Sequence, residues 1–561
     1  MEDGYYNLGR YSLALRTANR DCQEWFDRGL NWTYGYNHQE AVKCFRIAAS
    51  FDDNCPMPWW GIAYASGPNY NLPWHVLDAA SRATALAAAF DATQEALKRL
   101  NAYPKAVSEN QRALIEALPF RYPQRDPIDD MRPWNRNFAS AMREAYANFS
   151  GACDVCAIFA ESLLNLTPWK MWDIKTGKPA SGAETAECKR VLERSMSSSA
   201  LARAHPGILH AYVHLMEMSA TPEKALKAAD QLRTLCPDAG HLVHMATHIY
   251  VLCGDYESVV SWNQRACSAD YKFFIRNGDR NLYTGYRLHN YHFTIYGAML
   301  LGRFAPAYSA LQLIKANVSL DLLRIDSPPM ADFFESYLAL EPHVLVRFGQ
   351  WEKLMAMSLP QDRELQPTLL ANTHYARAVA FAATGRIAEA EVEECLFLNS
   401  KGDVPESRVL HNNSVRDLLE IATQTVRGEI AYRKGDFEQA FASLRQAVVL
   451  EDSLPYDEPW GWMQPTRHAL GALLFEQGHI EDAEQMFRED LGLTEHNTVS
   501  RSTIHPDNVW ALRGLHDCLK ARDERTEIHQ IAFRLNLALA RADTAVVSPC
   551  FCTQYAISQK T

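Results

Sequence analysis

Residues 428–447, GEIAYRKGDFEQAFASLRQA, decide the fold of this chain. Gly435 suits the left-handed backbone conformation that ends many helices, and an apolar residue, Phe437, follows two positions later. Small residues lie seven positions before Gly435 and five and twelve positions after it, where they allow two helices to approach closely. The stretch therefore predicts a helix, a tight turn and a second helix that packs back on the first.

The same pairing of glycine with a large apolar residue two positions later recurs along the chain. Its copies begin at Gly254, Gly302, Gly349, Gly385, Gly435 and Gly478. The intervals are 48, 47, 36, 50 and 43 residues, and internal periods of about 20–50 residues are typical of helical solenoids. The 561 residues therefore suit an elongated array better than one ordinary core.

These patterns resemble the tetratricopeptide repeat family across most of the chain. The match is specific at 25–48, 428–447 and 471–487 and looser elsewhere, and 66–73 and 167–182 interrupt it as Gly- and Pro-rich insertions. The resemblance implies an all-α, right-handed array, an α-solenoid, with no sheet of more than two strands. Such arrays usually bind peptides in a concave groove.

Composition argues against several classes of function. Hydrophobic residues make up 47% and charged residues 22%, as in ordinary globular proteins. A net charge of −11 and the lack of any basic block argue against nucleic-acid binding. No run approaches the roughly 20 apolar residues of a membrane span, and the acidic start lacks the apolar core of a secretory signal. We therefore expect a soluble, cytoplasmic protein without nucleic-acid or membrane partners.

The thirteen cysteines are scattered, as is typical of a reduced intracellular chain. The close pairs Cys153/Cys156 and Cys550/Cys552 lack the second pair of a zinc ribbon, so we expect helical packing for the first and a frayed end for the second. The expected segments are N-terminal repeats at 1–150, central repeats with the histidine cluster at 151–320, C-terminal repeats at 321–541 and a tail at 542–561.

Eight of the nineteen histidines lie between His205 and His292, in three segments that each read as a helix. Pro206 suits the first turn of the first helix, and the second is expected to run from Gly240 to Gly254. At about 100° per residue, the histidines of each segment share one face. Neighbouring first helices of a repeat array stand side by side, so these faces should line one groove. Neutral imidazoles on rigid helices are metal ligands, and they suit zinc, copper or iron. The predicted ligands of one or two ions are His210, His214, His244, His248, His289 and His292.

Two carboxylates are candidates for catalysis. Glu217 lies one turn beyond His214 and could be a ligand, an orienting partner or a general base. Glu161 lies in an apolar helix and is expected to face the groove. Tryptophans could wall an aromatic substrate pocket or serve as repeat core; they are Trp59, Trp60, Trp169 and Trp172. The isolated histidines are read as packing; they include His38, His343, His374 and His411.

Two further resemblances concern the histidines. The segments 205–217 and 240–250, with 35–41 and 60–63, resemble a widespread set of histidine-rich tetratricopeptide proteins, and this likeness implies no particular activity. The six-histidine helical pattern is also similar to that of the fungal cyclopenases, zinc-containing haemocyanin-like enzymes. That resemblance implies a zinc-dependent, ring-contracting enzyme of secondary metabolism that converts cyclopenin to the quinolone alkaloid viridicatin.

The sequence thus leaves several functions open. The first is a metal-dependent enzyme that acts on a small aromatic or alkaloid-type molecule, with zinc as a Lewis acid. The same histidines would also serve a copper or iron enzyme that activates oxygen. The alternative is a scaffold whose groove binds a peptide of a protein partner, with the histidines as a metal-free polar lining.

Overall fold

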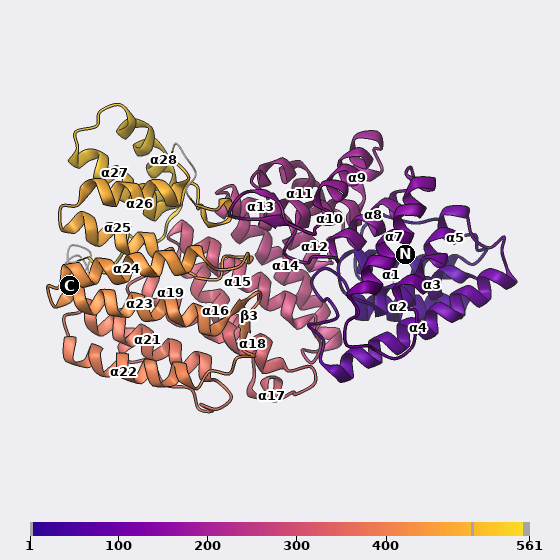
Figure 1. Cartoon of the computed structure of the whole chain (residues 1–561), viewed down its shortest axis with the longest axis horizontal. Helices are drawn as coiled ribbons and strands as arrows, with labels where there is room; N and C mark the ends of the chain where they lie inside the picture. The colour runs from indigo at the N-terminus through magenta and orange to yellow at the C-terminus, as the bar shows by residue number, and fades with distance from the viewer. Residues whose placement is uncertain (1–3, 495–498, 554–561) are drawn as a thin grey trace. The chain divides into compact units, whose positions relative to one another are not determined.

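The computed structural model describes residues 4–494 and 499–553. These residues form two compact units (Figure 1). Unit 1 comprises Met1–Ile249 and Arg265–Gly278, and unit 2 comprises Tyr250–Gln264 and Asp279–Thr561. The four segments expected from the sequence remain a prediction.

Unit 1 consists of helices with one two-stranded ribbon. Its helices are α1 (Arg20–Tyr34), α2 (His38–Phe51), α3 (Pro56–Ser66), α4 (Ala79–Ala102), α5 (Glu109–Glu116), α6 (Leu118–Arg121), α7 (Arg132–Phe149), α8 (Cys153–Leu164), α9 (Thr185–Ser198), α10 (Pro206–Glu217), α11 (Leu226–Leu232) and α12 (Gly240–His244). The ribbon pairs β1 (Trp172–Asp173) with β2 (Lys178–Pro179), and 3₁₀ turns lie at Ala202–Ala204 and Pro222–Ala225. Both predicted insertions, 66–73 and 167–182, fall between helices as expected, except that Ser66 is the last residue of α3.

Two helices contribute to both units, α13 (Ala246–Leu252) and α14 (Tyr256–Asn277). The remaining helices of unit 2 are α15 (Thr284–Leu301), α16 (Phe304–Asn317), α17 (Leu320–Leu323), α18 (Met330–Leu338), α19 (Leu340–Arg347), α20 (Trp351–Met355), α21 (Pro367–Ala383), α22 (Ile387–Gly402), α23 (Val415–Arg433), α24 (Phe437–Asp452), α25 (Thr466–Glu476), α26 (Ile480–Leu491), α27 (Val509–Ala521) and α28 (Glu527–Arg541). A second ribbon pairs β3 (Val409–Leu410) with β4 (Asn413–Ser414), and a 3₁₀ turn spans Arg501–Thr503.

The predicted glycine turns are confirmed. All six glycines adopt the left-handed conformation, with φ between +56° and +82°. In each case the next helix begins at the large apolar residue two positions later; these residues are Tyr256, Phe304, Trp351, Ile387, Phe437 and Ile480. Glycine stops one helix there because it enters this conformation without a steric penalty.

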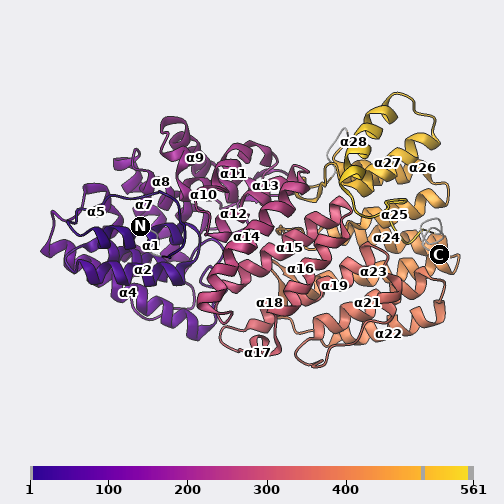
Figure 2. The same cartoon turned by 180° about the vertical axis from the view of Figure 1, so that it is seen from behind.

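Within unit 2, helices α21 to α27 lie side by side as successive helix hairpins, in Figure 1 and from behind in Figure 2. Among the described residues, no sheet has more than two strands. The chain therefore folds as an all-α, tetratricopeptide-like helical repeat array, as predicted.

Close packing of the hairpins depends on glycines that face an aromatic ring. A Cβ added to Gly471 would lie 2.7 Å from the ring of Phe487, and one added to Gly514 would lie 2.4 Å from it. Phe45 fills the corresponding position in the N-terminal repeat, where glycines of α1 and α3 face it. The repeat signature at 25–48 and 471–487 thus reflects helices whose backbones meet across one ring.

We expect Gly471→Ala to destabilise unit 2 by about 1–3 kcal/mol, because the added methyl overpacks a fully buried ring. Denaturant-induced unfolding followed by circular dichroism measures the change. Gly402→Ala is the matched control: it lies at the end of α22, and nothing stands within 4 Å of its added Cβ. Equal stabilities of the two variants would contradict this packing.

Two local expectations were wrong. The helix expected from Gly240 to Gly254 is interrupted at Met245, where the N–H of His248 donates to the Met245 carbonyl at 3.3 Å and tightens the turn. The end of the described chain is also not frayed, because Phe551 and Cys552 are buried and a disulfide joins Cys550 to Cys552. Residues 554–561 of the expected tail lie outside the described residues.

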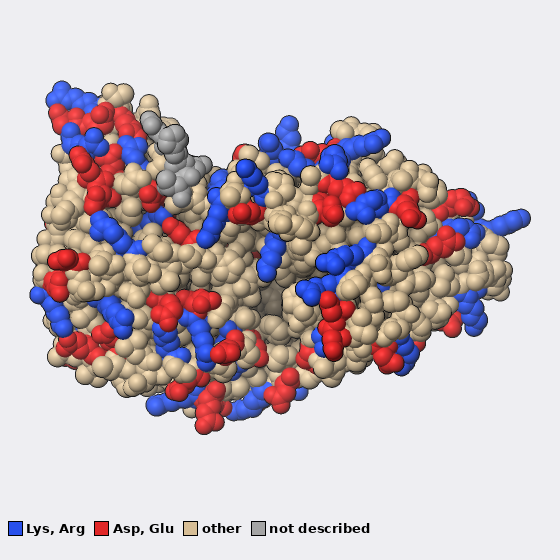
Figure 3. Space-filling model, in the orientation of Figure 1, with Lys and Arg blue, Asp and Glu red and all other residues tan. Residues whose placement is uncertain are grey.

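The surface in Figure 3 mixes acidic and basic side chains. Both signs are interspersed on this face, in agreement with the mixed composition of the sequence. None of the described helices is long and apolar enough to cross a membrane.

Several isolated histidines are core residues, as expected. His343 packs edge-on against Trp462, with ring centroids 4.7 Å apart, and burial lowers its pKa to about 4. An imidazole whose pKa is lower in the folded protein than in the unfolded chain takes up its proton on unfolding. The free energy of unfolding therefore falls as the pH drops below about 6.5.

We expect the free energy of unfolding of unit 2 to fall by about 2 kcal/mol between pH 6.5 and pH 5 because of His343 alone. His343→Phe keeps a ring against Trp462 but cannot titrate. Unfolding curves at pH 7.5 and pH 5 should therefore show a smaller loss of stability for this variant than for the wild type. An unchanged pH dependence would contradict the assignment of His343 as a buried neutral ring.

Candidate metal centre

Helix α10 carries the first histidine segment and is buried along its whole length. Pro206 occupies its first turn, as predicted, because proline has no N–H to satisfy and its φ suits a helix. His205 caps this end: its Nδ1 accepts the N–H of Ile208 at 3.2 Å. His205 is thus a capping residue, whereas His210 and His214, farther along α10, reach the site.

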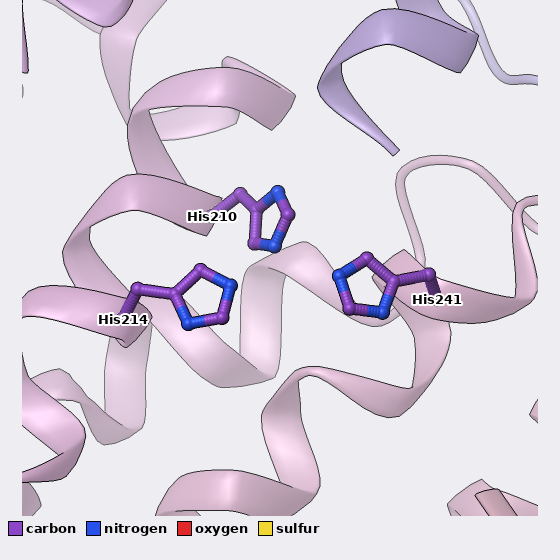
Figure 4. A group of neighbouring side chains, drawn as sticks. All are labelled: His210, His214 and His241. Carbon is purple, nitrogen blue, oxygen red and sulfur yellow. The ribbon is translucent and has the colours of Figure 1, made fainter. Parts of the chain in front are cut away.

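His210, His214 and His241 form the centre of the site. One ring nitrogen from each lies within 4.8 Å of the other two, and all three side chains are buried. Figure 4 shows the three rings turned toward one another, two from α10 and one from α12. Two nitrogens bound to one tetrahedral zinc ion lie roughly 3.3 Å apart. The separations of these ring nitrogens therefore exceed that value by at most about 1.5 Å.

Hydrogen bonds fix which nitrogen each ring presents. His210 Nδ1 donates to the backbone carbonyl of Tyr34 at 2.7 Å. The Glu217 carboxylate accepts from Nδ1 of His214 at 2.9 Å and from Nδ1 of His248 at 2.6 Å. A neutral imidazole that carries its proton on Nδ1 has its lone pair on Nε2. His210 and His214 therefore offer Nε2 as a ligand atom, in the arrangement by which carboxylates and carbonyls orient metal-binding histidines, and His248 turns its Nε2 lone pair toward His244.

His244 and His248 form a second part of the site. Their Nε2 atoms lie 2.7 Å apart, and the hydroxyl of Thr247 lies 3.4 Å from His244 Nδ1. Because His248 carries its proton on Nδ1, the proton between the two Nε2 atoms belongs to His244. The interruption at Met245 lies between the two residues, so that His244 ends α12 and His248 lies on α13.

Aromatic rings cover the histidines. Tyr36 stacks on His214 and His241 and lies 4.3 Å from His210 between ring centroids. Tyr70 lies 4.5 Å from His214, and Trp169 lies 5.2 Å from Tyr70. Tyr36 and Trp169 both have positive φ, at 54° and 53°. Bulky residues hold this conformation only where the surroundings enforce it, and such strain concentrates at functional sites.

The electrostatics favour neutral rings. Burial, reinforced by the neighbouring imidazoles, holds the pKa of His241 well below its usual range. Neutral imidazole is the form that binds metal ions. Three histidine ligands also leave a fourth tetrahedral position open, as catalytic zinc sites do. The arrangement could therefore bind an ion.

Glu161 lies apart from this hydrogen-bond network. Its Oε2 accepts from the hydroxyl of Tyr64 at 2.7 Å, and burial raises its pKa. Oε1 has no hydrogen-bond partner among the described residues. The buried guanidinium of Arg121 lies over the Tyr64 ring. The structure thus places Glu161 in a polar cluster with Tyr64 and Arg121.

The four tryptophans suggested as pocket walls have different surroundings. Trp60 is buried and stacks on Tyr64, and Trp59 lies under the guanidinium of Arg99. The indole N–H of Trp172 donates to the carbonyl of Leu215 at 2.6 Å. Trp169 alone among them joins the rings around the histidines, through Tyr70.

The predicted ligand set is divided between the units. His210, His214, His244 and His248 belong to unit 1, whereas His289 and His292 belong to unit 2. A site that joins all six therefore remains a prediction. The set also omitted His241, although its spacing of three and seven residues from His244 and His248 already placed it on their face.

Comparisons with known proteins give distant likenesses of fold. No family model and no curated protein sequence matches the chain. Among solved structures, the chain is similar to human IFIT1, solved as a dimer with m7Gppp-AAAA, at 12% identity over 93% of this chain and 91% of that chain, with a TM-score of 0.29. It is also similar to yeast Tom70, at 12% identity over 92% and 99% of the two chains, with a TM-score of 0.31. At these scores the likeness carries no argument about function.

Proposed function

We propose that unit 1 binds one transition-metal ion, with zinc as the first candidate, through His210, His214 and His241. The observation that carries this proposal is the convergence of three ring nitrogens, together with the hydrogen bonds that fix the tautomers of His210 and His214. Histidines that only pack in a core each find their own hydrogen-bond partners, and their rings have no reason to converge. A shared cation accounts for three buried rings that converge on one point, because it offsets the cost of burying them together.

We further propose that the ion serves catalysis on a small aromatic molecule. A bound zinc ion would polarise a carbonyl or epoxide oxygen as a Lewis acid. One oxygen of Glu217 would hold the ligand His214 in the tautomer that binds the ion, and the other would fix its neighbour His248 in the same tautomer. Tyr36, Tyr70 and Trp169 would supply the aromatic surroundings.

Copper and iron are alternatives on the same ligands, since imidazole binds all three metals. With either one, the chemistry would change to oxygen activation. The resemblance to cyclopenases supplies one named substrate, cyclopenin, and related aromatic lactams form the first panel to assay.

The experiment uses the full chain purified without a polyhistidine tag. The protein is stripped with a chelator, supplied with zinc, copper or iron singly, and assayed with cyclopenin and aromatic lactams. Activity that disappears with the metal and returns with one metal supports the proposal. Metal binding without turnover of the panel leaves the ion site in place and rejects these substrates, whereas protein that takes up no metal rejects the whole proposal.

A scaffold role is the second candidate, and α28 supplies the observation that favours it. Ile531 and Leu535 pack inward, but Phe533 and Leu537 are 67% and 54% exposed. The last helix of a repeat array usually has a polar outer face that keeps the array soluble. An apolar outer face here would suit an apolar segment of a protein partner.

Partner binding through α28 is tested with Phe533→Ser combined with Leu537→Ser. Because both side chains are exposed, the double variant should keep the wild-type stability. Partner proteins that cross-link to the wild type should no longer cross-link to the double variant. Val392→Ser, at an exposed apolar position on α22, is the control and should still cross-link to them. Identical partners for all three proteins would reject α28 as the docking surface.

A further inference from the structure

A second group of histidines lies within unit 2. One ring nitrogen from each of His289, His292 and His411 lies within 4.8 Å of the other two. His289 and His292 are three residues apart on α15 and so share one face. His411 lies in the turn between β3 and β4 and was read as a packing residue from the sequence. The fold therefore brings His411, from a distant part of the chain, next to two of the predicted ligands, His289 and His292.

His292 lacks an ordinary hydrogen-bond partner. The ring is fully buried, and its Nδ1 has no partner among the described residues. Its Nε2 lies 2.9 Å from the Sδ atom of Met463. A thioether is only a weak acceptor, so both nitrogens of a buried polar ring are poorly satisfied. Such groups are rare in folded proteins and call for an explanation, such as an ion.

His411 is held in place by several contacts. Its backbone has a φ of 50°, a conformation that a non-glycine side chain rarely adopts. Its Nδ1 donates to the carbonyl of Glu458 at 3.2 Å, and a carboxylate oxygen of Asp457 lies 3.4 Å away. The lone pair therefore resides on Nε2, which accepts from the hydroxyl of Tyr337 at 2.8 Å. An ion bound at this nitrogen would take the place of the Tyr337 hydroxyl as its partner.

We propose that His289, His292, His411 and Met463 form a metal site of unit 2 that takes copper in the +1 state. Three imidazoles and one thioether make a nitrogen- and sulfur-donor set. Imidazole accepts zinc, copper, iron and nickel, whereas a thioether selects the soft Cu(I) ion, so copper is the metal that suits both. The site uses residues of unit 2 alone and does not depend on the proposed ion of unit 1.

The test uses the full chain with His210→Ala and His241→Phe, so that the ligand group of unit 1 is incomplete. The protein is titrated with Cu(I) without oxygen, against a competing chelator, and the copper is examined by X-ray absorption spectroscopy. Met463→Leu removes the sulfur at nearly constant volume. Met355→Leu is the matched control, because the sulfur of Met355 lies near Thr384 and Arg386 instead.

We expect one Cu(I) ion per chain with a sulfur neighbour at about 2.3 Å, the usual length of a metal–sulfur bond. Met463→Leu should remove the sulfur signal and weaken binding by at least about tenfold, the lower end of the effect of losing a partner around a metal. His411→Asn, which tolerates positive φ, should weaken binding similarly while circular dichroism stays unchanged. No bound copper, copper without sulfur, or equal affinities for the Met463 and Met355 variants would overturn the proposal.

Discussion

His241→Phe is expected to abolish tight metal binding by unit 1. Phenylalanine keeps the ring that stacks on Tyr36 but removes the nitrogen that converges with those of His210 and His214. Loss of an outer partner already lowers metal affinity about 10–100-fold, so loss of a ligand should lower it by more than about 100-fold. Competition titrations with zinc and a chromophoric chelator measure the affinity of the full chain.

His75→Phe is the control for this experiment. It removes an exposed imidazole of the same unit that belongs to none of the described ligand groups. Its zinc affinity should equal that of the wild type. If His241→Phe and His75→Phe bind zinc equally well, His241 is no ligand, and its burial among other imidazoles needs another explanation.

Glu217→Gln is expected to weaken metal binding although the side-chain volume hardly changes. The amide oxygen can accept the Nδ1–H of one histidine, but the amide nitrogen can only donate. The oxygen should keep the shorter of the two bonds, to His248 at 2.6 Å, so that His214 faces the amide nitrogen and must move its own proton to Nε2. That ring then turns an N–H toward the site in place of a lone pair, and zinc affinity should fall about 10–100-fold.

Glu161→Gln provides the matched comparison, because Glu161 is also a buried carboxylate of unit 1 but accepts from Tyr64. Its zinc affinity should remain at the wild-type value. A general base at position 217 would give the opposite pattern, since a Glu217→Gln protein would keep its metal and lose only turnover. Zinc titration and assay of the same samples therefore separate an orienting role from a catalytic one.

The fold was predictable from local chemistry. Glycine and a large apolar residue two positions later specify a helix stop and a helix start within three residues, and no long-range information is needed. Positions such as Gly435 and Phe437 therefore marked their turn and helix correctly. The break at Met245 was not predictable in this way, because neither proline nor glycine marks it.

The candidate site was predictable only in part. Helical spacing grouped the histidines on faces and paired Glu217 with His214, since both lie on α10. It could not supply Tyr36 or the carbonyl of Tyr34, which come from a segment about 175 residues away in sequence. Likewise, nothing local to His411 connects it with α15, because the fold of unit 2 makes that connection.

The central claim is that unit 1 holds a metal ion, and metal analysis of the purified protein tests it most directly. The full chain is prepared without a polyhistidine tag in metal-free buffers, and its zinc, copper and iron are quantified by mass spectrometry. The account predicts about one ion per chain that the His241→Phe protein lacks. Wild-type protein that carries none of these metals, and takes up none when they are supplied, would contradict it.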